Sequence, residues 1–219
     1  QALILSSASM IGLGTIFVTF NSQIVSLIYE RGAFDGNAVK LVSSLLIAYG
    51  IGMPVYLGRD LIVRIFYCLG DAKTPFRFSS IGIFINIILD WIAIGAPSPL
   101  GNLSPINLGA AGIVFATVGV NAITYIYLLI RLKSKTKGLK MKELFIDKIK
   151  LLFSGFISGT LAFAIQSLVI WPSSFLGLFG QVIISIIISL ILFISIGILF
   201  RVKEIKDLII IVSKKFILH

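Results

Sequence analysis

The sequence predicts an all-α integral membrane protein with about six transmembrane helices and an amphipathic helix near its C-terminal end. Three observations lead to this prediction. Of the 219 residues, 58% are hydrophobic and only 13% are charged, and the mean hydropathy is +1.07. The apolar residues form runs of about 18 or more, the length that a helix needs to cross roughly 30 Å of hydrocarbon. Lysines and arginines gather at alternate ends of these runs.

The same composition excludes several classes of protein. A soluble enzyme, a nucleic-acid-binding protein or a secreted domain needs a charged surface that this chain lacks. Cys68 is the single cysteine, so an internal disulfide and a cysteine-based metal site are excluded. His219 is the single histidine and the last residue. Since the sequence also shows no nucleophile–base pair, phosphate-binding loop or metal-ligand cluster, we do not expect an enzyme.

Six apolar stretches are expected to form the transmembrane helices, over residues 3–29, 38–69, 76–96, 109–131, 148–171 and 177–200. The second stretch is longer than one span requires, and it carries Pro54 beside two glycines, which predicts a kink or a break. In residues 203–218, Ile and Leu alternate with Lys, which is typical of an amphipathic helix at the membrane surface. We expect residues 1–219 to form one membrane domain. Because the chain begins inside an apolar stretch, we expect further helices upstream of it.

The positions of the basic residues predict the orientation of the helices. All but two of the 19 lysines and arginines lie around residues 70–75, in the linker near 131–150, or in the tail; the exceptions are Arg31 and Lys40. The stretches 97–108 and 172–178 carry no charge. Positive charge marks cytoplasmic loops, so the second loop, the fourth loop, the tail and both ends of the chain are expected in the cytoplasm. The net charge of +10 is then a topology signal, strengthened by anionic membrane lipids, and needs no nucleic acid.

Asp90 is the residue most indicative of function, because it lies within the third apolar stretch. A carboxylate at that depth costs about 2.5–3.5 kcal/mol on insertion scales and needs a partner, a cavity or a cation. Asn86 lies one helical turn earlier on the same face. The two oxygens suit a hard cation such as sodium, or a proton. The alternative is a carboxylate near the outer interface that is hydrogen-bonded for packing.

Two further groups of polar residues each allow two structural interpretations. Thr117, in the fourth stretch, can offer its hydroxyl to a neighbour or bond back to its own helix. Arg59, Asp60 and Arg64, late in the second stretch, can line a water-filled cavity and contact an anionic headgroup. In the other reading the arginines extend to the cytoplasmic interface, with Asp60 as an internal partner.

Three loop motifs connect this chain to a known family. Residues 29–34 read YERGAF, residues 64–75 read RIFYCLGDAKTP, and residues 107–112 read NLGAAG. Together they resemble the MurJ/MviN family of lipid II flippases, in the multidrug/oligosaccharidyl-lipid/polysaccharide exporter superfamily. The resemblance covers the whole chain, and the residues of its first two motifs that we single out are Arg31, Gly32, Phe34, Phe66, Tyr67, Asp71, Thr74 and Pro75.

The resemblance implies that the chain is the last six of fourteen helices, most of the C-terminal lobe of a transporter in the bacterial cytoplasmic (inner) membrane. It implies a role in peptidoglycan biosynthesis, cell-wall biogenesis and cell shape. The substrate would be lipid II, the undecaprenyl-pyrophosphate-linked peptidoglycan precursor, carried to the outer leaflet by alternating access. The partners would be lipid II, membrane lipids and the missing N-terminal lobe, which holds most headgroup-binding arginines. The last two helices would border a hydrophobic groove for the lipid tail.

The resemblance also implies a cation site, with sodium as its only candidate cofactor. In sodium-binding members the ligands are an Asn and an Asp on one helix, and a backbone carbonyl and a Thr on the next. These match Asn86 and Asp90, then Ile113 and Thr117, in this sequence. A further acidic ligand would come from a helix upstream.

Two alternatives to lipid II transport stay open at this point. The first is a flippase for another lipid-linked oligosaccharide or polysaccharide, or for a drug, on the same fold. The second is a membrane scaffold that recruits cell-wall enzymes without transporting anything. Such a scaffold would tolerate loss of Asp90, which makes substitution of that residue a discriminating test.

Overall fold

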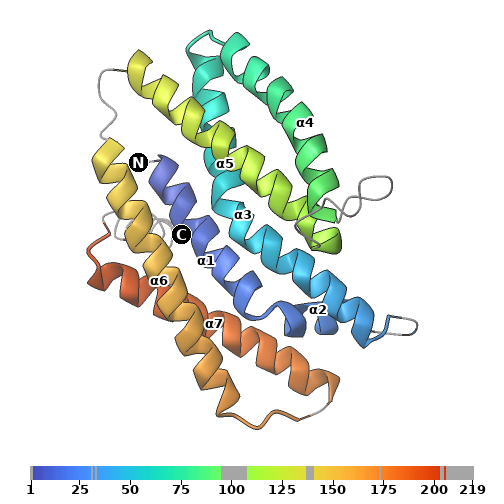
Figure 1. The fold of residues 1–219 in the computed structure, drawn as a ribbon. Coiled ribbons are helices and arrows are strands. Elements are labelled where there is room, and N and C mark those ends of the chain that lie inside the picture. Colours follow the sequence, from blue (N-terminus) through green and yellow to red (C-terminus); the bar gives the residue numbers. More distant parts are fainter. Residues whose placement is uncertain are drawn as a thin grey trace, which may run out of the picture.

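The computed structural model describes residues 2–30, 32, 34–94, 108–136, 141–172, 174–202 and 205. Within these residues the chain is helical and contains no strand (Figure 1). The helices are α1 (Ala2–Thr19), α2 (Asn21–Tyr29), α3 (Gly36–Cys68), α4 (Lys73–Ile94), α5 (Gly109–Lys135), α6 (Met141–Ser167) and α7 (Phe175–Leu199). The all-α membrane fold predicted from the sequence is confirmed. Of the predicted surface helix 203–218, only Ile205 lies within the described residues.

The first apolar stretch forms two helices where the sequence analysis expected one. The axes of α1 and α2 differ by 76°. The break falls at Phe20, which has φ −111° and ψ 27°. Next to it, the Asn21 side-chain amide donates a hydrogen bond to the Val18 carbonyl, at 2.8 Å. An asparagine that bonds to its own backbone competes with helix continuation, which explains the bend at this point.

The second stretch is one continuous helix of 33 residues, α3, despite Pro54 in its interior. Asp35 caps its N-terminus by accepting hydrogen bonds from the backbone N–H groups of Asn37 and Ala38. Proline has no N–H and cannot bond to the carbonyl four residues earlier, here that of Gly50. Gly14 of α1 lies against that carbonyl, and a Cβ on Gly14 would collide with it. The predicted break therefore does not occur, and a kink at Pro54 stays a prediction. The Gly50 carbonyl that Pro54 leaves free lies at a close contact between α1 and α3.

The remaining stretches each form one helix. α4 begins three residues earlier than expected, and α5 extends four residues beyond residue 131. α6 begins at Met141 and takes in much of the basic linker. Ser174 caps α7 by accepting a hydrogen bond from the Gly177 N–H, at 3.1 Å.

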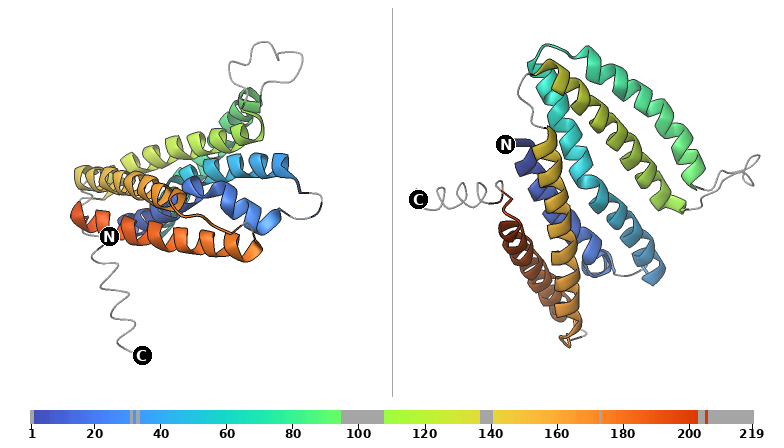
Figure 2. Two further views of the ribbon diagram at one scale, coloured as in Figure 1. Left: turned by 90° about the horizontal axis from the view of Figure 1, so that it is seen from below. Right: turned by 60° about the vertical axis from the view of Figure 1, so that its left-hand side comes forward.

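The helices form a curved row in the order α4, α5, α3, α1, α6, α7 (Figures 1 and 2). Neighbours in this row pack against each other, and α7 also contacts α1 and α2. Five of the described helices are long and apolar enough to cross a membrane, and the bent pair α1–α2 makes a sixth if it is one span. Helix α4 lies at one end of the row, where only one of its sides is covered.

The distribution of burial fits a lipid environment. Small apolar clusters lie between neighbouring helices; one joins Ile62 and Phe66 of α3 to Leu128 and Leu132 of α5. Many large apolar side chains point outward, and on α4 these include Phe84, which is 70% exposed. In water such a surface would be unstable, whereas in a bilayer these side chains face acyl chains.

Candidate functional site

The four predicted cation ligands lie together where α4 packs against α5. Asn86 and Asp90 are one turn apart on α4, and Ile113 and Thr117 are one turn apart on α5. The Asn86 amide nitrogen donates to the Asp90 carboxylate at 2.6 Å and also approaches the Thr117 hydroxyl oxygen, at 3.3 Å. The Thr117 hydroxyl donates to the Ile113 carbonyl at 2.9 Å. Both interpretations of Thr117 therefore hold, because its hydroxyl donates to a carbonyl of its own helix and accepts from Asn86 on the neighbouring helix.

Small residues bring the two helices close enough for these contacts. A Cβ on Gly112 would lie 2.5 Å from the Ala93 carbonyl oxygen, and one on Gly82 would lie 3.2 Å from the Val120 side chain. The same Ala93 carbonyl accepts a hydrogen bond from the Leu108 N–H, at 3.1 Å, just before α5 begins. The site thus depends on glycines that allow backbone contact between α4 and α5.

Two oxygen atoms at this site lack a partner among the described residues. They are Asn86 Oδ1 and one carboxylate oxygen of Asp90, Oδ1, and both are buried. A buried polar atom without a hydrogen bond costs free energy. Carboxylate, carboxamide, hydroxyl and backbone carbonyl oxygens are the ligands that hard cations prefer. The residues therefore fit a cation such as sodium in their chemistry.

Asp90 lies four residues before the end of α4. At 1.5 Å per residue this places it about 6 Å from the end of the helix. The site is thus nearer to one membrane face than the sequence analysis assumed. This depth is closer to that of the alternative, in which Asp90 is a carboxylate near the outer interface. Among the described residues, none gives Asn86 Oδ1 or Asp90 Oδ1 a hydrogen bond, so both oxygens are available to a further partner such as a cation.

A polar cleft extends from this site between α3, α4 and α5. Its volume is about 300 Å³. Polar groups from all three helices line it, together with four small or apolar residues; the polar members are Arg59, Ser79, Asn86, Thr117, Asn121 and Thr124. The sequence analysis missed Asn121, whose amide donates to the Thr117 carbonyl at 2.7 Å. Asn121 lies four residues after Thr117 and therefore on the same helix face, which could have identified it from the sequence.

The three charged residues late in α3 have different surroundings. Arg59 lines the cleft, and its Nη2 donates to the Ser79 hydroxyl at 2.8 Å. Its Nη1 lies 3.7 Å from the carboxylate of Asp60, whose side chain is 59% exposed. Arg64 is exposed and does not line the cleft. The cavity reading therefore fits Arg59, and the interface reading fits Arg64.

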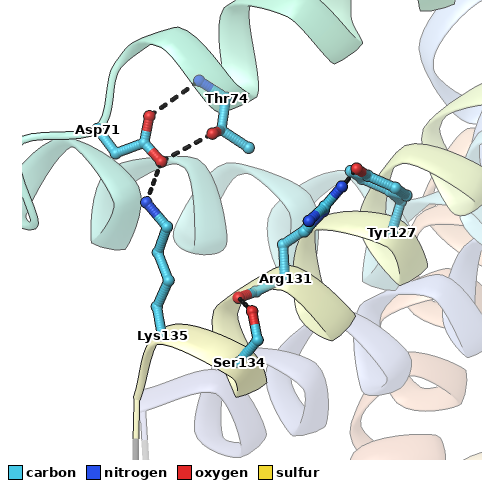
Figure 3. Close-up of polar contacts among 6 residues, drawn as sticks. All are labelled: Asp71, Thr74, Tyr127, Arg131, Ser134 and Lys135. Atoms are coloured by element: carbon cyan, nitrogen blue, oxygen red, sulfur yellow. Dashed lines mark hydrogen bonds and ion pairs between the residues drawn. The ribbon is translucent and has the colours of Figure 1, made fainter.

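The second loop motif, residues 64–75, covers the end of α3 and the start of α4, and its Asp71 side chain contacts the end of α5 (Figure 3). The Asp71 carboxylate accepts hydrogen bonds from the Thr74 N–H at 3.0 Å and the Thr74 hydroxyl at 2.7 Å. It also pairs with the Lys135 ammonium at the end of α5. The bonds from Lys135 and then Thr74 hold the pKa of the Asp71 carboxyl well below its usual range. The sequence analysis did not single out Lys135, because its partner lies 64 residues away.

The other residues of the first two loop motifs differ in burial and in their contacts. Phe66 and Pro75 are buried, whereas Tyr67 is exposed. Gly32 has φ +61°, a conformation that favours glycine. The Phe34 ring packs against Tyr29, with 5.8 Å between the ring centroids. Arg31 lies outside the described residues.

Two apolar grooves border α6 and α7. One lies between α1, α3 and α6 and has a volume of about 300 Å³; Gly14, Gly50, Gly155 and Gly159 contribute to its walls. The other lies between α1 and α7, at Gly12 and Phe193. The expected groove beside the last two helices thus has two candidates, both shared with α1.

Comparisons with known proteins agree on one family. The family model described as lipid II flippase MurJ matches residues 1–189. A probable lipid II flippase MurJ from Synechocystis sp. is 42% identical over 141 residues, which cover 64% of this chain and 24% of that protein. A probable lipid II flippase MurJ from Thermotoga maritima is 27% identical over 209 residues, or 95% of this chain and 38% of that protein.

The likeness extends to three dimensions. A solved structure of a lipid II flippase MurJ in an inward closed conformation superposes with a TM-score of 0.62 at 26% sequence identity. The superposition covers 94% of this chain and 37% of that one. The chain therefore spans between about a quarter and two fifths of the length of these relatives.

Proposed function

Because this chain belongs to the lipid II flippase MurJ family, we propose that it forms part of a transporter that moves lipid II to the outer leaflet of the bacterial cytoplasmic membrane. The observation that supports a transporter most directly is the polar cleft between α3, α4 and α5, which holds Asn86 and Thr117 among outward-facing apolar helices. A scaffold has no need for polar groups and unpartnered oxygens inside its helices.

The division of work follows from what the chain contains. The pyrophosphate headgroup would bind mainly to residues upstream, because Arg59 is the only charged residue of the described part that lines the cleft. The polyprenyl tail would lie along the apolar grooves that α6 and α7 share with α1. Both ends of the chain would face the cytoplasm, as the positions of the lysines and arginines indicate.

Asn86, Asp90, Thr117 and the Ile113 carbonyl would hold a sodium ion. Bound there, the ion would supply positive charge to the unpartnered oxygens of Asn86 and Asp90. Ion coupling requires that the inward-open and outward-open states differ in their affinity for the ion. In this chain Gly112 and Gly82 allow the close contact of α4 with α5 on which the ligand geometry depends.

The experiment expresses the full-length gene in cells depleted of their own flippase and measures the lipid II that reaches the outer leaflet. We expect restored translocation. Asp90→Asn should reduce it about tenfold or more, because loss of even an outer-shell partner of a metal ligand typically costs about 10–100-fold in metal affinity or activity. Asp35→Asn is the control, because Asp35 is exposed and does not line the cleft and asparagine caps a helix about as well as aspartate; it should leave translocation unchanged.

The failures are equally informative. Protein that inserts stably but moves no lipid II would indicate another lipid-linked glycan as the substrate. Flux that is unchanged by Asp90→Asn, by sodium and by pH would contradict ion coupling.

A further inference from the structure

The cleft that reaches the cation ligands has a positive charge near its other end. Arg59 donates to Ser79 at 2.8 Å, and Ser79 lies seven residues before Asn86 on α4. At 1.5 Å per residue, these two positions on α4 are about 10 Å apart. Both Arg59 and Asn86 line the same cleft, so the guanidinium and the cation ligands share one polar space.

The charge of Arg59 is incompletely neutralised. Its Nε is buried and has no hydrogen-bond partner among the described residues. Its acidic neighbour Asp60 lies 3.7 Å away, with a side chain that is 59% exposed against 25% for Arg59. Solvent and salt screen an exposed charge more than a partly buried one, so the field of Asp60 within the cleft is weaker than that of Arg59 and offsets it only in part. The other side chains that line the cleft are neutral.

Two positive charges in a shared cleft repel each other. At about 10 Å and an effective dielectric constant of about 20, the repulsion corresponds to roughly a tenfold change in an equilibrium constant. The neutral polar walls at Asn121 and Thr124 carry no charge that would cancel this repulsion. A cation between Asn86 and Asp90 would therefore bind in the field of Arg59.

We propose that Arg59 is an affinity-setting residue, which weakens cation binding at Asn86 and Asp90 through the cleft that it shares with them. The inference rests on the proposed function, because it concerns the cation site assigned there. A transporter must release its coupling ion in each cycle, and a fixed positive charge in the cleft prevents binding from becoming too tight. Movement of α4 relative to α3 would change the distance between charge and ion, and hence the affinity.

The test measures sodium binding to the purified full-length protein, with choline chloride keeping the ionic strength constant. Binding is read by calorimetry and by the sodium-dependent rise in melting temperature, so transport activity is not needed. We expect Arg59→Gln to lower the dissociation constant for sodium about tenfold. Arg59→Lys keeps the charge and should stay within about twofold of the unsubstituted protein.

Arg64→Gln is the matched control. Arg64 lies on the same helix and has the same charge, but it is exposed outside the cleft, so sodium affinity should not change. Ser79→Asp tests the charge without removing the arginine, because a carboxylate beside Arg59 neutralises its field; this variant should also tighten sodium binding. Ser79→Asn, which adds no charge, should not.

Two results would overturn the proposal and are distinguishable. If Asp90→Asn abolishes sodium binding but Arg59→Gln and Ser79→Asp leave the affinity unchanged, the cation site stands and the role of Arg59 is wrong. If Asp90→Asn binds sodium like the unsubstituted protein, the cation site assigned under the proposed function fails, and the role of Arg59 fails with it.

Discussion

At the scale of single residues, Asp71 makes a prediction about pH. Lys135 and Thr74 hold the pKa of its carboxyl below the usual range, so the folded state favours the carboxylate more than the unfolded state does. Its stabilising contribution is then complete above the unfolded pKa of about 4, and is lost as the pH falls toward the lower folded value. Asp71→Asn should lower the melting temperature of the full-length protein by a few degrees at pH 7, and by less below about pH 4.

The control for this prediction is Asp35→Asn. Asp35 also caps a helix, by accepting from Asn37 and Ala38, and asparagine caps about as well as aspartate. We expect a smaller loss at pH 7 than for Asp71→Asn. A difference between Asp71→Asn and the unsubstituted protein that stays constant from pH 7 to pH 3 would contradict the assigned ion pair.

The sequence itself singled out three candidate ligands, Asn86, Asp90 and Thr117, but not their surroundings. Asn86 and Asp90 are four residues apart, which places them on one helix face. Ile113 came only from the family resemblance, which supplies its backbone carbonyl. Arg59 and Arg64 have equal charge and similar sequence contexts. Only the packing of α3 against α4 and α5 decides that Arg59 faces the cleft, and such packing cannot be read from periodicity.

At the scale of helices, the contact between α1 and α3 predicts that one added methyl group at Gly50 strongly lowers the stability of the protein. A Cβ on Gly14 would collide with the Gly50 carbonyl, and one on Gly50 would lie 2.9 Å from the Gly14 carbonyl oxygen. Gly50→Ala should therefore destabilise the full-length protein by about 1–3 kcal/mol, as overpacking does. Steric trapping or thermal unfolding of the full-length protein in lipid would measure this change.

Gly119→Ala is the matched control, because Gly119 lies within α5 and a Cβ there meets nothing within 4 Å. It should be neutral or slightly stabilising, since alanine favours a helix more than glycine does. If both variants lost stability equally, helix propensity or handling would explain the result, and the close contact would not.

The helix scale also shows where local sequence signals are insufficient. Pro54 predicted a kink or a break in the second stretch, and α3 has no break there. The Gly50 carbonyl that Pro54 leaves without its helical hydrogen bond lies against Gly14 of α1. The break between helices that the sequence analysis did not expect lies at Phe20, between α1 and α2. The sequence feature that could have predicted this break is Asn21, because asparagine side chains readily bond to nearby backbone groups. An asparagine within an apolar stretch is by itself too weak a signal to predict a break.

At the scale of the whole molecule, the charge pattern and the fold point to the same arrangement. The Asp71–Lys135 pair places the connection between α3 and α4 beside the end of α5. Val202, just after α7, packs in one cluster with Ala8 of α1 and Leu151 of α6. In the described part of the chain, the connection between α3 and α4 therefore lies beside the end of α5, and the residue after α7 packs with α1 and α6. This is compatible with the proposed cytoplasmic side, which the basic residues of these regions indicate.

This arrangement predicts which residues are reached from each side of the membrane. Cys68 is exposed at the end of α3, and Asn37 is exposed at its start, 31 residues earlier. A helix of that length spans about 46 Å, enough to cross the bilayer. In the full-length protein with its other cysteines replaced, a membrane-impermeant maleimide should label Cys68 in inverted vesicles but not in intact cells. Asn37→Cys in a Cys68→Ser background should be labelled in intact cells, and the reverse pattern would overturn the proposed topology.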